Sequence, residues 1–199
     1  MRVVQAELYR LGTIRSWWVS LLAGWMLMLL IGVLGAGEWI FVVGLVAFVI
    51  GVVGGAQHYQ HRTAVLVFLA RPHRVVVLAA QALAYGLVAA VVTALGGLTR
   101  LVFGDWRTCL WAVLAAALLA VFGLANAVVL RRAIWIIVGY GVWFLVVEAF
   151  LGLLARPLPF SSYLGAASGR TGALAVLAGW VLASLAAAGA LTRRDVNGS

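Results

Sequence analysis

The stretch WIFVVGLVAFVIGVVGGAQHYQHRTAVLVFLARPHR, residues 39–74, decides the fold. Its first part, residues 39–56, contains no charged side chain, whereas residues 57–74 carry three histidines and three arginines. An α-helix needs about 20 apolar residues to cross the hydrocarbon core of a bilayer, which is about 30 Å thick. The stretch therefore predicts a membrane-spanning helix that is followed by a segment in water.

The same alternation of apolar runs and short basic breaks continues along the chain. Of its 199 residues, 66% are hydrophobic and 10% are charged, whereas soluble domains carry about 25% charged residues. We predict an all-α integral membrane protein with one transmembrane domain, residues 1–199, and six transmembrane helices. The predicted spans are residues 17–35, 39–56, 75–97, 110–130, 133–155 and 172–191.

Only Arg131 and Arg132 separate the fourth predicted span from the fifth. One continuous helix over both apolar runs would be too long for a single crossing, even if it were tilted. We therefore predict a tight helical hairpin at these two arginines.

Two segments outside the spans have patterns of their own. Residues 1–16 precede the first span, and there Val4, Leu8 and Leu11 recur at helical spacing. This spacing predicts a short amphipathic helix in the membrane interface. Residues 156–171 contain two prolines within an apolar surrounding. Because proline breaks a helix, we predict a surface loop for this second segment, with a re-entrant segment that dips back into the membrane as the alternative.

All 14 basic residues are arginines, and they lie at the ends of the apolar runs. Cytoplasmic loops of membrane proteins are enriched in basic residues. We predict that both termini are cytoplasmic, because this places ten arginines inside and leaves four outside. The ten are Arg2, Arg10, Arg15, Arg62, Arg71, Arg74, Arg131, Arg132, Arg193 and Arg194. The same rule explains the net charge of +9, so we expect no nucleic-acid partner.

The chain lacks the sequence patterns of common catalytic sites. It contains no P-loop, no HExxH and no GxSxG pattern, which mark nucleotide, zinc and acyl-transfer chemistry. His58 and His61 could share a helical face, but no carboxylate or thiol lies nearby to complete a metal site. We therefore expect no catalytic, cofactor-binding or metal site in this chain, and no enzyme activity.

Glu148 is the one acid that lies well inside a predicted span. A charged side chain at the centre of a bilayer costs about 2.5–3.5 kcal/mol or more, so it normally faces the bundle interior or a wet cavity. Glu148 could line a cavity or couple transport, or it could pair with Arg156 or Arg100. The sequence favours neither interpretation.

Milder polar residues and small residues also occur within the spans. We expect Gln81, Tyr85, Thr93 and Asn126 to hydrogen-bond with neighbouring helices. Gly51 and Gly55 form a GxxxG pair, which permits close approach of another helix. This pair is weak support for a dimer face.

The order of motifs resembles that of the ABC-2 type permeases, the membrane subunits of a class of ABC transporters. The segment from Glu7 to Trp18 is similar to the N-terminal elbow of that family. Residues 58–63 and 69–74 are similar to its segment between the second and third spans, and residues 193–196 to its C-terminal ending. Gln57 and Arg62 depart from the acid and the glycine that the family has at these positions.

The resemblance implies that residues 57–74 are a cytoplasmic coupling segment that docks on a separate ABC ATPase. The residues assigned to docking are His58, Tyr59, Arg62, Thr63, Phe68, Leu69, Arg71 and Arg74. The resemblance also implies a second permease subunit, with ATP and Mg bound by the ATPase rather than by this chain. It assigns Phe144, Glu148 and Phe150 to the translocation pathway of an exporter in the cell membrane, taken here as a bacterial plasma membrane.

The apolar composition would suit a hydrophobic or amphipathic substrate and contact with membrane lipid. Two other classes remain open. One is a small ion-coupled secondary transporter in which Glu148 titrates. The other is a membrane assembly subunit that transports nothing.

Overall fold

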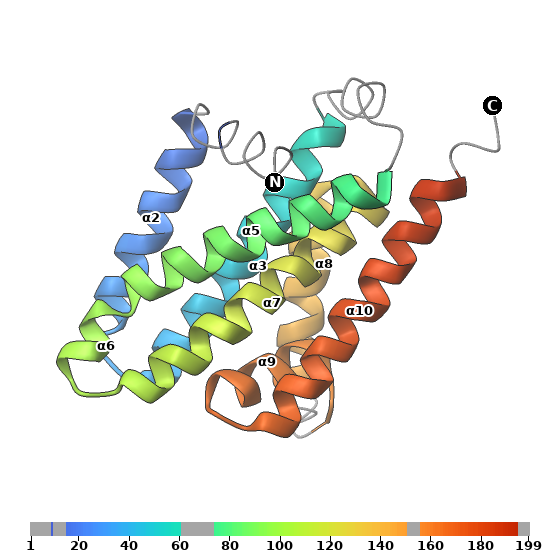
Figure 1. Cartoon of the computed structure of the whole chain (residues 1–199). Coiled ribbons are helices and arrows are strands. Elements are labelled where there is room, and N and C mark those ends of the chain that lie inside the picture. The colour runs from blue at the N-terminus through green and yellow to red at the C-terminus, as the bar shows by residue number, and fades with distance from the viewer. Residues whose placement is uncertain (1–8, 10–14, 61–73, 151–155, 195–199) are drawn as a thin grey trace.

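The computed structural model describes residues 9, 15–60, 74–150 and 156–194, and every regular element within these residues is a helix. Figure 1 shows the long helices side by side in one bundle. The helices are α2 (Arg15–Ile31), α3 (Ala36–Gln60), α5 (Arg74–Gly96), α6 (Leu98–Val102), α7 (Trp106–Leu130), α8 (Ala133–Val142), the π-helix η1 (Trp143–Phe150), α9 (Pro159–Ala167) and α10 (Thr171–Arg194).

Four helical segments in the described part of the chain are long and apolar enough to cross a membrane. They match the predicted second, third, fourth and sixth spans, and they are Ala36–Gln57, Val75–Gly96, Trp106–Leu130 and Thr171–Thr192. The predicted first and fifth spans correspond to shorter apolar helices, Trp17–Ile31 and Ala133–Glu148. The chain is thus an all-α protein whose several apolar helices indicate a multi-pass membrane protein.

The boundaries of the first and fifth predicted spans differ from the observed helices. Helix α2 ends at Ile31 rather than at residue 35, because the chain turns through Gly32 to Gly35 before α3 begins. The fifth span continues from α8 into η1 and is helical through Phe150. Residues 151–155 of that prediction lie outside the described residues.

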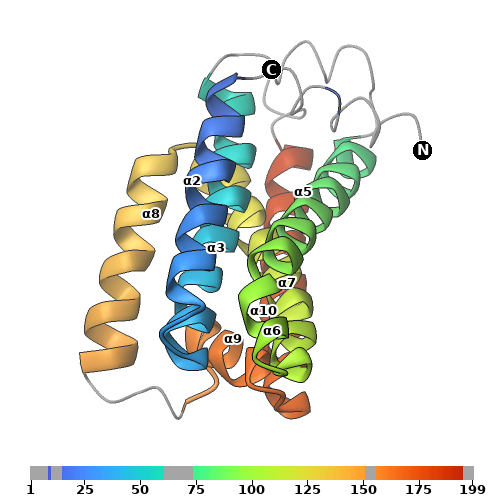
Figure 2. The same cartoon turned by 90° about the vertical axis from the view of Figure 1, so that its left-hand side faces the viewer.

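Helices α3 and α7 form the centre of the bundle. Helix α7 packs against α3, α5, α9 and α10, and α3 also contacts α2, α5 and α8. In Figure 1, α2 lies at one side of the bundle and α10 at the other, and Figure 2 shows α8 alongside α3. Most of α10 is exposed, as expected for a helix that faces lipid.

Glycines allow α3 and α7 to approach each other closely. A Cβ at Gly51 would overlap the carbonyl group of Ala120, and a Cβ at Gly123 would lie 2.7 Å from the carbonyl oxygen of Phe48. A Cβ at Gly55 would lie 2.9 Å from the Cβ of Ala127. The GxxxG pair on α3 therefore packs within the chain, and its interpretation as a dimer face is wrong.

Residues 159–167 form the short helix α9, eight of whose nine residues are buried. It packs against α3, α7 and α10. The ring of Tyr163 lies against Gly44 of α3, and its hydroxyl donates a 2.8 Å hydrogen bond to the carbonyl of Ile40. The segment is therefore not a surface loop, but a helix folded back against the bundle.

The arginines of the described residues lie at or next to the ends of helices. These helix ends gather at the two ends of the bundle (Figures 1 and 2). One end, called here the arginine-rich end, contains Arg15, Arg74, Arg131, Arg132, Arg193 and Arg194. The far end contains Arg100, Arg107, Arg156 and Arg170, together with Glu38 and Asp105. The distribution agrees with the grouping of loops that the sequence predicts.

Candidate functional site

Most of the predicted docking segment lies outside the described residues, namely Arg62, Thr63, Phe68, Leu69 and Arg71. His58 and Tyr59 belong to the last turn of α3, which continues beyond the apolar run to Gln60. Arg74 is the first residue of α5. Both helix ends lie at the arginine-rich end of the bundle.

Glu148 is fully buried and contacts the beginning of α9. Its carboxylate accepts hydrogen bonds from the backbone N–H groups of Phe160 and Ser161, at 3.4 and 2.6 Å. The indole N–H of Trp143 donates a third hydrogen bond, at 3.1 Å. The first N–H groups of a helix have no partner within the helix, and a carboxylate there is favoured by the helix dipole. Glu148 therefore caps α9 from a different helix.

The π-helix η1 explains how Trp143 and Glu148 reach each other. Backbone hydrogen bonds in a π-helix join residues five apart, and residues 143 and 148 have this spacing. The two side chains consequently lie on the same side of η1 and bond to each other. Such a local departure from α-helical geometry has no signature in the apolar sequence WFLVVEAF.

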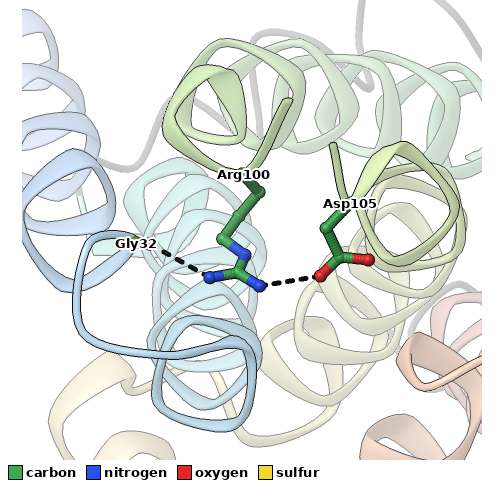
Figure 3. A network of polar contacts seen from close by, with 3 residues as sticks. All are labelled: Gly32, Arg100 and Asp105. Atoms are coloured by element: carbon green, nitrogen blue, oxygen red, sulfur yellow. Dashed lines mark hydrogen bonds and ion pairs between the residues drawn. The ribbon is translucent and has the colours of Figure 1, made fainter. Parts of the chain in front are cut away.

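Neither arginine considered as a partner for Glu148 forms an ion pair with it in the described part of the chain. Arg156 contacts this region through its backbone, because its carbonyl oxygen accepts a 2.7 Å hydrogen bond from the hydroxyl of Ser161. Arg100 bonds at the far end of the bundle instead. Its guanidinium lies 2.8 Å from the carboxylate of Asp105 and donates a 3.4 Å hydrogen bond to the carbonyl of Gly32 (Figure 3).

This arginine joins the turn after α2 to the turn before α7. The hydrogen bond from Arg100 holds the pKa of Asp105 below its ordinary value of 3.8, and a hydrogen bond from Thr108 adds to the effect. Asp105 therefore stays ionised at neutral pH, and its ion pair with Arg100 fixes the two turns relative to each other.

The predicted pathway residues Phe144, Glu148 and Phe150 do not surround one cavity. Phe144 is buried and packs against the rings of Phe41 and Phe160, at centroid distances of 5.5 and 5.3 Å. Phe150 is 83% exposed. Phe144 and Glu148 both contact α9, so these two residues share a packed helix as their neighbour rather than a cavity.

A groove of about 570 Å³ lies between α7, α8 with η1, and α10. We call it the α7–α10 groove. It is rich in aromatic side chains, and the residues used to define it are Phe122, Asn126, Trp135, Tyr140, Trp143 and Trp180. Clefts that bind small molecules commonly have volumes of about 300–1,000 Å³, so the groove is large enough to hold a ligand.

A polar pair crosses the groove from α7 to α8. The hydroxyl of Tyr140 donates a 2.8 Å hydrogen bond to the side-chain oxygen of Asn126. The amide nitrogen of Asn126 donates in turn to the carbonyl of Phe122, also at 2.8 Å. This contact confirms the expected bonding of Asn126 to a neighbouring helix. Thr93 differs, since its buried hydroxyl has no hydrogen-bond partner among the described residues.

Two tryptophans close the end of the groove that lies nearest α9. Trp143 donates to Glu148, and the indole N–H of Trp180 donates a 2.9 Å hydrogen bond to the carbonyl of Pro157. Trp180 is thereby fixed to the segment that leads into α9, and Trp143 is fixed to the acid that caps α9. No pattern in the sequence gave either tryptophan a role, and Asn126 within a span was the only sign of this site.

Comparison with known proteins found no match to a protein-family model, to a curated protein or to a solved structure. The fold defines the class only as a multi-pass α-helical membrane protein.

Proposed function

We propose that this chain is the permease subunit of an ABC-2 type transporter in the cell membrane, and that it exports a hydrophobic or amphipathic molecule. A separate ABC ATPase docks on residues 57–74, binds ATP and Mg, and supplies the energy. The observation that carries the proposal is the position of this segment. It connects the end of α3 at Gln60 with the start of α5 at Arg74, at the arginine-rich end.

Movement of the coupling segment would act directly on the centre of the bundle. Helix α3 continues from Gln60 into its close contact with α7 at Gly51 and Gly55. Because closely packed helices transmit displacement rather than absorb it, α3 and α7 would move as one unit. A docked ATPase could thus reorient the core of the subunit.

The same close packing supports a second permease subunit. Helices α3 and α7 approach so tightly that a Cβ at Gly51 would not fit between them. A translocation pathway is therefore expected between two subunits rather than between these two helices. The second subunit is this chain or a paralogue.

Glu148 weighs against an ion-coupled mechanism. Its carboxylate bonds to two backbone N–H groups and one indole N–H. An ion carrier would have to break these bonds in every cycle and leave the first turn of α9 without partners.

The proposal is tested by affinity purification of this chain from its native membrane, with detection of an ABC ATPase in the purified complex. Phe68→Ala with Arg71→Ala should remove the ATPase from the purified complex, because both side chains belong to the docking segment. The matched control is Phe103→Ala with Arg107→Ala, which removes an exposed phenylalanine and an exposed arginine at the far end. Retention of the ATPase by the Phe68 and Arg71 variant would refute docking at residues 57–74.

A further inference from the structure

We propose that the α7–α10 groove binds one anionic phospholipid molecule. The phosphate lies at Arg131 and Arg132, the glycerol esters lie beside Asn126 and Tyr140, and an acyl chain lies against the aromatic walls. The proposal does not depend on the transport function proposed above.

The groove begins directly beneath the arginine-rich end. Its lining on α7 runs from Phe122 to Leu130, which is about 12 Å of helix at about 1.5 Å per residue. Arg131 and Arg132 follow Leu130 immediately, and both are exposed. Two positive charges therefore stand at the mouth of the groove, on the turn between α7 and α8.

The chemistry along the groove changes in the same order as along a phospholipid. The cationic mouth comes first, and Asn126 lies one helical turn, about 6 Å, further in. Asn126 and Tyr140 are bonded to each other, yet the amide of Asn126 carries a second N–H that can donate to an ester carbonyl. Beyond them the walls are the rings of Phe122, Trp143 and Trp180.

Charge complementarity and access both favour a lipid as the occupant. Basic pockets between transmembrane helices bind anionic headgroups, and each basic residue near an anionic surface contributes about 1 kcal/mol. On the α10 side, the part of the wall that follows Trp180 consists of the small residues Ala183, Ser184 and Ala187, so this part of the groove can be entered sideways from the bilayer.

The experiment measures thermal unfolding of the full chain in a neutral detergent, with added dioleoylphosphatidylglycerol or dioleoylphosphatidylcholine. The two lipids share their acyl chains and differ in headgroup charge. At about 100 times Kd, the anionic lipid should raise Tm by about 5 °C or more, whereas the zwitterionic lipid should raise it far less. An equal rise with both lipids would overturn the proposal.

Two pairs of variants separate the groove from general charge effects. Arg131→Gln with Arg132→Gln should abolish the preference for the anionic lipid, whereas Arg107→Gln with Arg170→Gln removes the same charge at the far end and should preserve it. Ala183→Trp should block the groove without a change in charge. Its control is Ala186→Trp, on the exposed part of α10 outside the groove.

The groove-blocking pair keeps the proposal testable if the arginine variant fails to fold. Loss of the lipid preference with Ala183→Trp, but not with Ala186→Trp, supports a lipid in the groove. A preference retained in Ala183→Trp would mean that the headgroup binds only at the surface, and it would refute the groove as the site. A dimer in detergent that Ala183→Trp dissociates, without any lipid preference, would show that a second copy of the chain occupies the groove instead.

Discussion

At the scale of single residues, Glu148 illustrates how a buried acid in a membrane protein can be accommodated without a cation. Its carboxylate lies where the first backbone N–H groups of α9 need an acceptor, and it bonds to those of Phe160 and Ser161. The residue that the sequence marked as the best candidate for transport chemistry therefore stabilises the fold.

This role predicts a graded loss of stability at Glu148. Glu148→Gln keeps one acceptor oxygen and should cost about 1 kcal/mol, whereas Glu148→Leu leaves the N–H groups unpaired and should cost about 3 kcal/mol. Thermal unfolding in detergent measures both, with the exposed Phe150→Leu as the control. An unfolding midpoint unchanged in Glu148→Leu, together with lost transport in Glu148→Gln, would restore the ion-coupling interpretation.

Asp105 predicts a dependence of stability on pH. Its pKa is lowered in the folded chain, chiefly by the hydrogen bond from Arg100. A lowered pKa means that the pair contributes stability above the unfolded pKa, and that this contribution is lost as the pH falls through the folded pKa. Asp105→Asn should lower Tm at neutral pH, and the difference from the native chain should disappear in strong acid. A difference that persists or grows in acid would contradict the assigned role of the ion pair.

At the scale of helices, the sequence predicted the long elements because their signal is local. Apolar runs bounded by arginines predicted α3, α5, α7 and α10, and Arg131 and Arg132 predicted the break before α8. Arg131 ends α7 in the left-handed conformation, with a φ of 58°. Helix α9 was not predicted, because its two flanking prolines indicated a break. Pro159 instead stands at the start of the helix, where the hydroxyl of Ser161 accepts from the N–H of Leu158, and Glu148 adds a cap from another helix. Likewise, the GxxxG spacing predicts close approach but does not identify the partner helix.

The candidate site was less predictable than the helices, because its residues are distant from one another in the sequence. Asn126, Tyr140 and Trp180 come from three helices, and no spacing along the chain relates them. Their proximity follows only from the packing of α8 and α10 beside α7. The predicted pathway residues 144, 148 and 150 are close in sequence, yet they point to different surroundings.

The packing of α3 on α7 predicts opposite effects for one substitution at two glycines. In a helix, replacing glycine with alanine is favourable by about 1 kcal/mol. At Gly139 no neighbouring atom lies within 4 Å of the position that a Cβ would occupy, so Gly139→Ala should be neutral or stabilising. Gly51→Ala should instead lower the free energy of unfolding by about 1–3 kcal/mol, because its methyl group would displace the backbone of α7. Equal unfolding midpoints would disprove the close contact, and a change in oligomeric mass with Gly51→Ala would revive the dimer face.

At the scale of the whole molecule, the bundle has a rigid centre and a lipid-facing periphery. Helix α3 is the most buried of the four long helices and α10 is the least buried. The arginine-rich end combines the ends of α3 and α5 with the mouth of the α7–α10 groove. The proposed docking segment and the proposed lipid site therefore lie on the same side of the membrane. Both proposals require the arginine-rich end to face the cytoplasm.

That orientation can be measured because the chain has a single cysteine. Cys109 is buried, and Cys109→Ala provides a background without thiols. In this background, Arg132→Cys and Arg107→Cys each place a thiol at an exposed position, at opposite ends of the bundle. The positive-inside rule predicts that a membrane-impermeant maleimide labels Arg107→Cys in intact cells, and labels Arg132→Cys only after the membrane is opened. The reverse pattern would place residues 57–74 outside the cell, where no ATPase could reach them, and would remove the basis for the transport proposal.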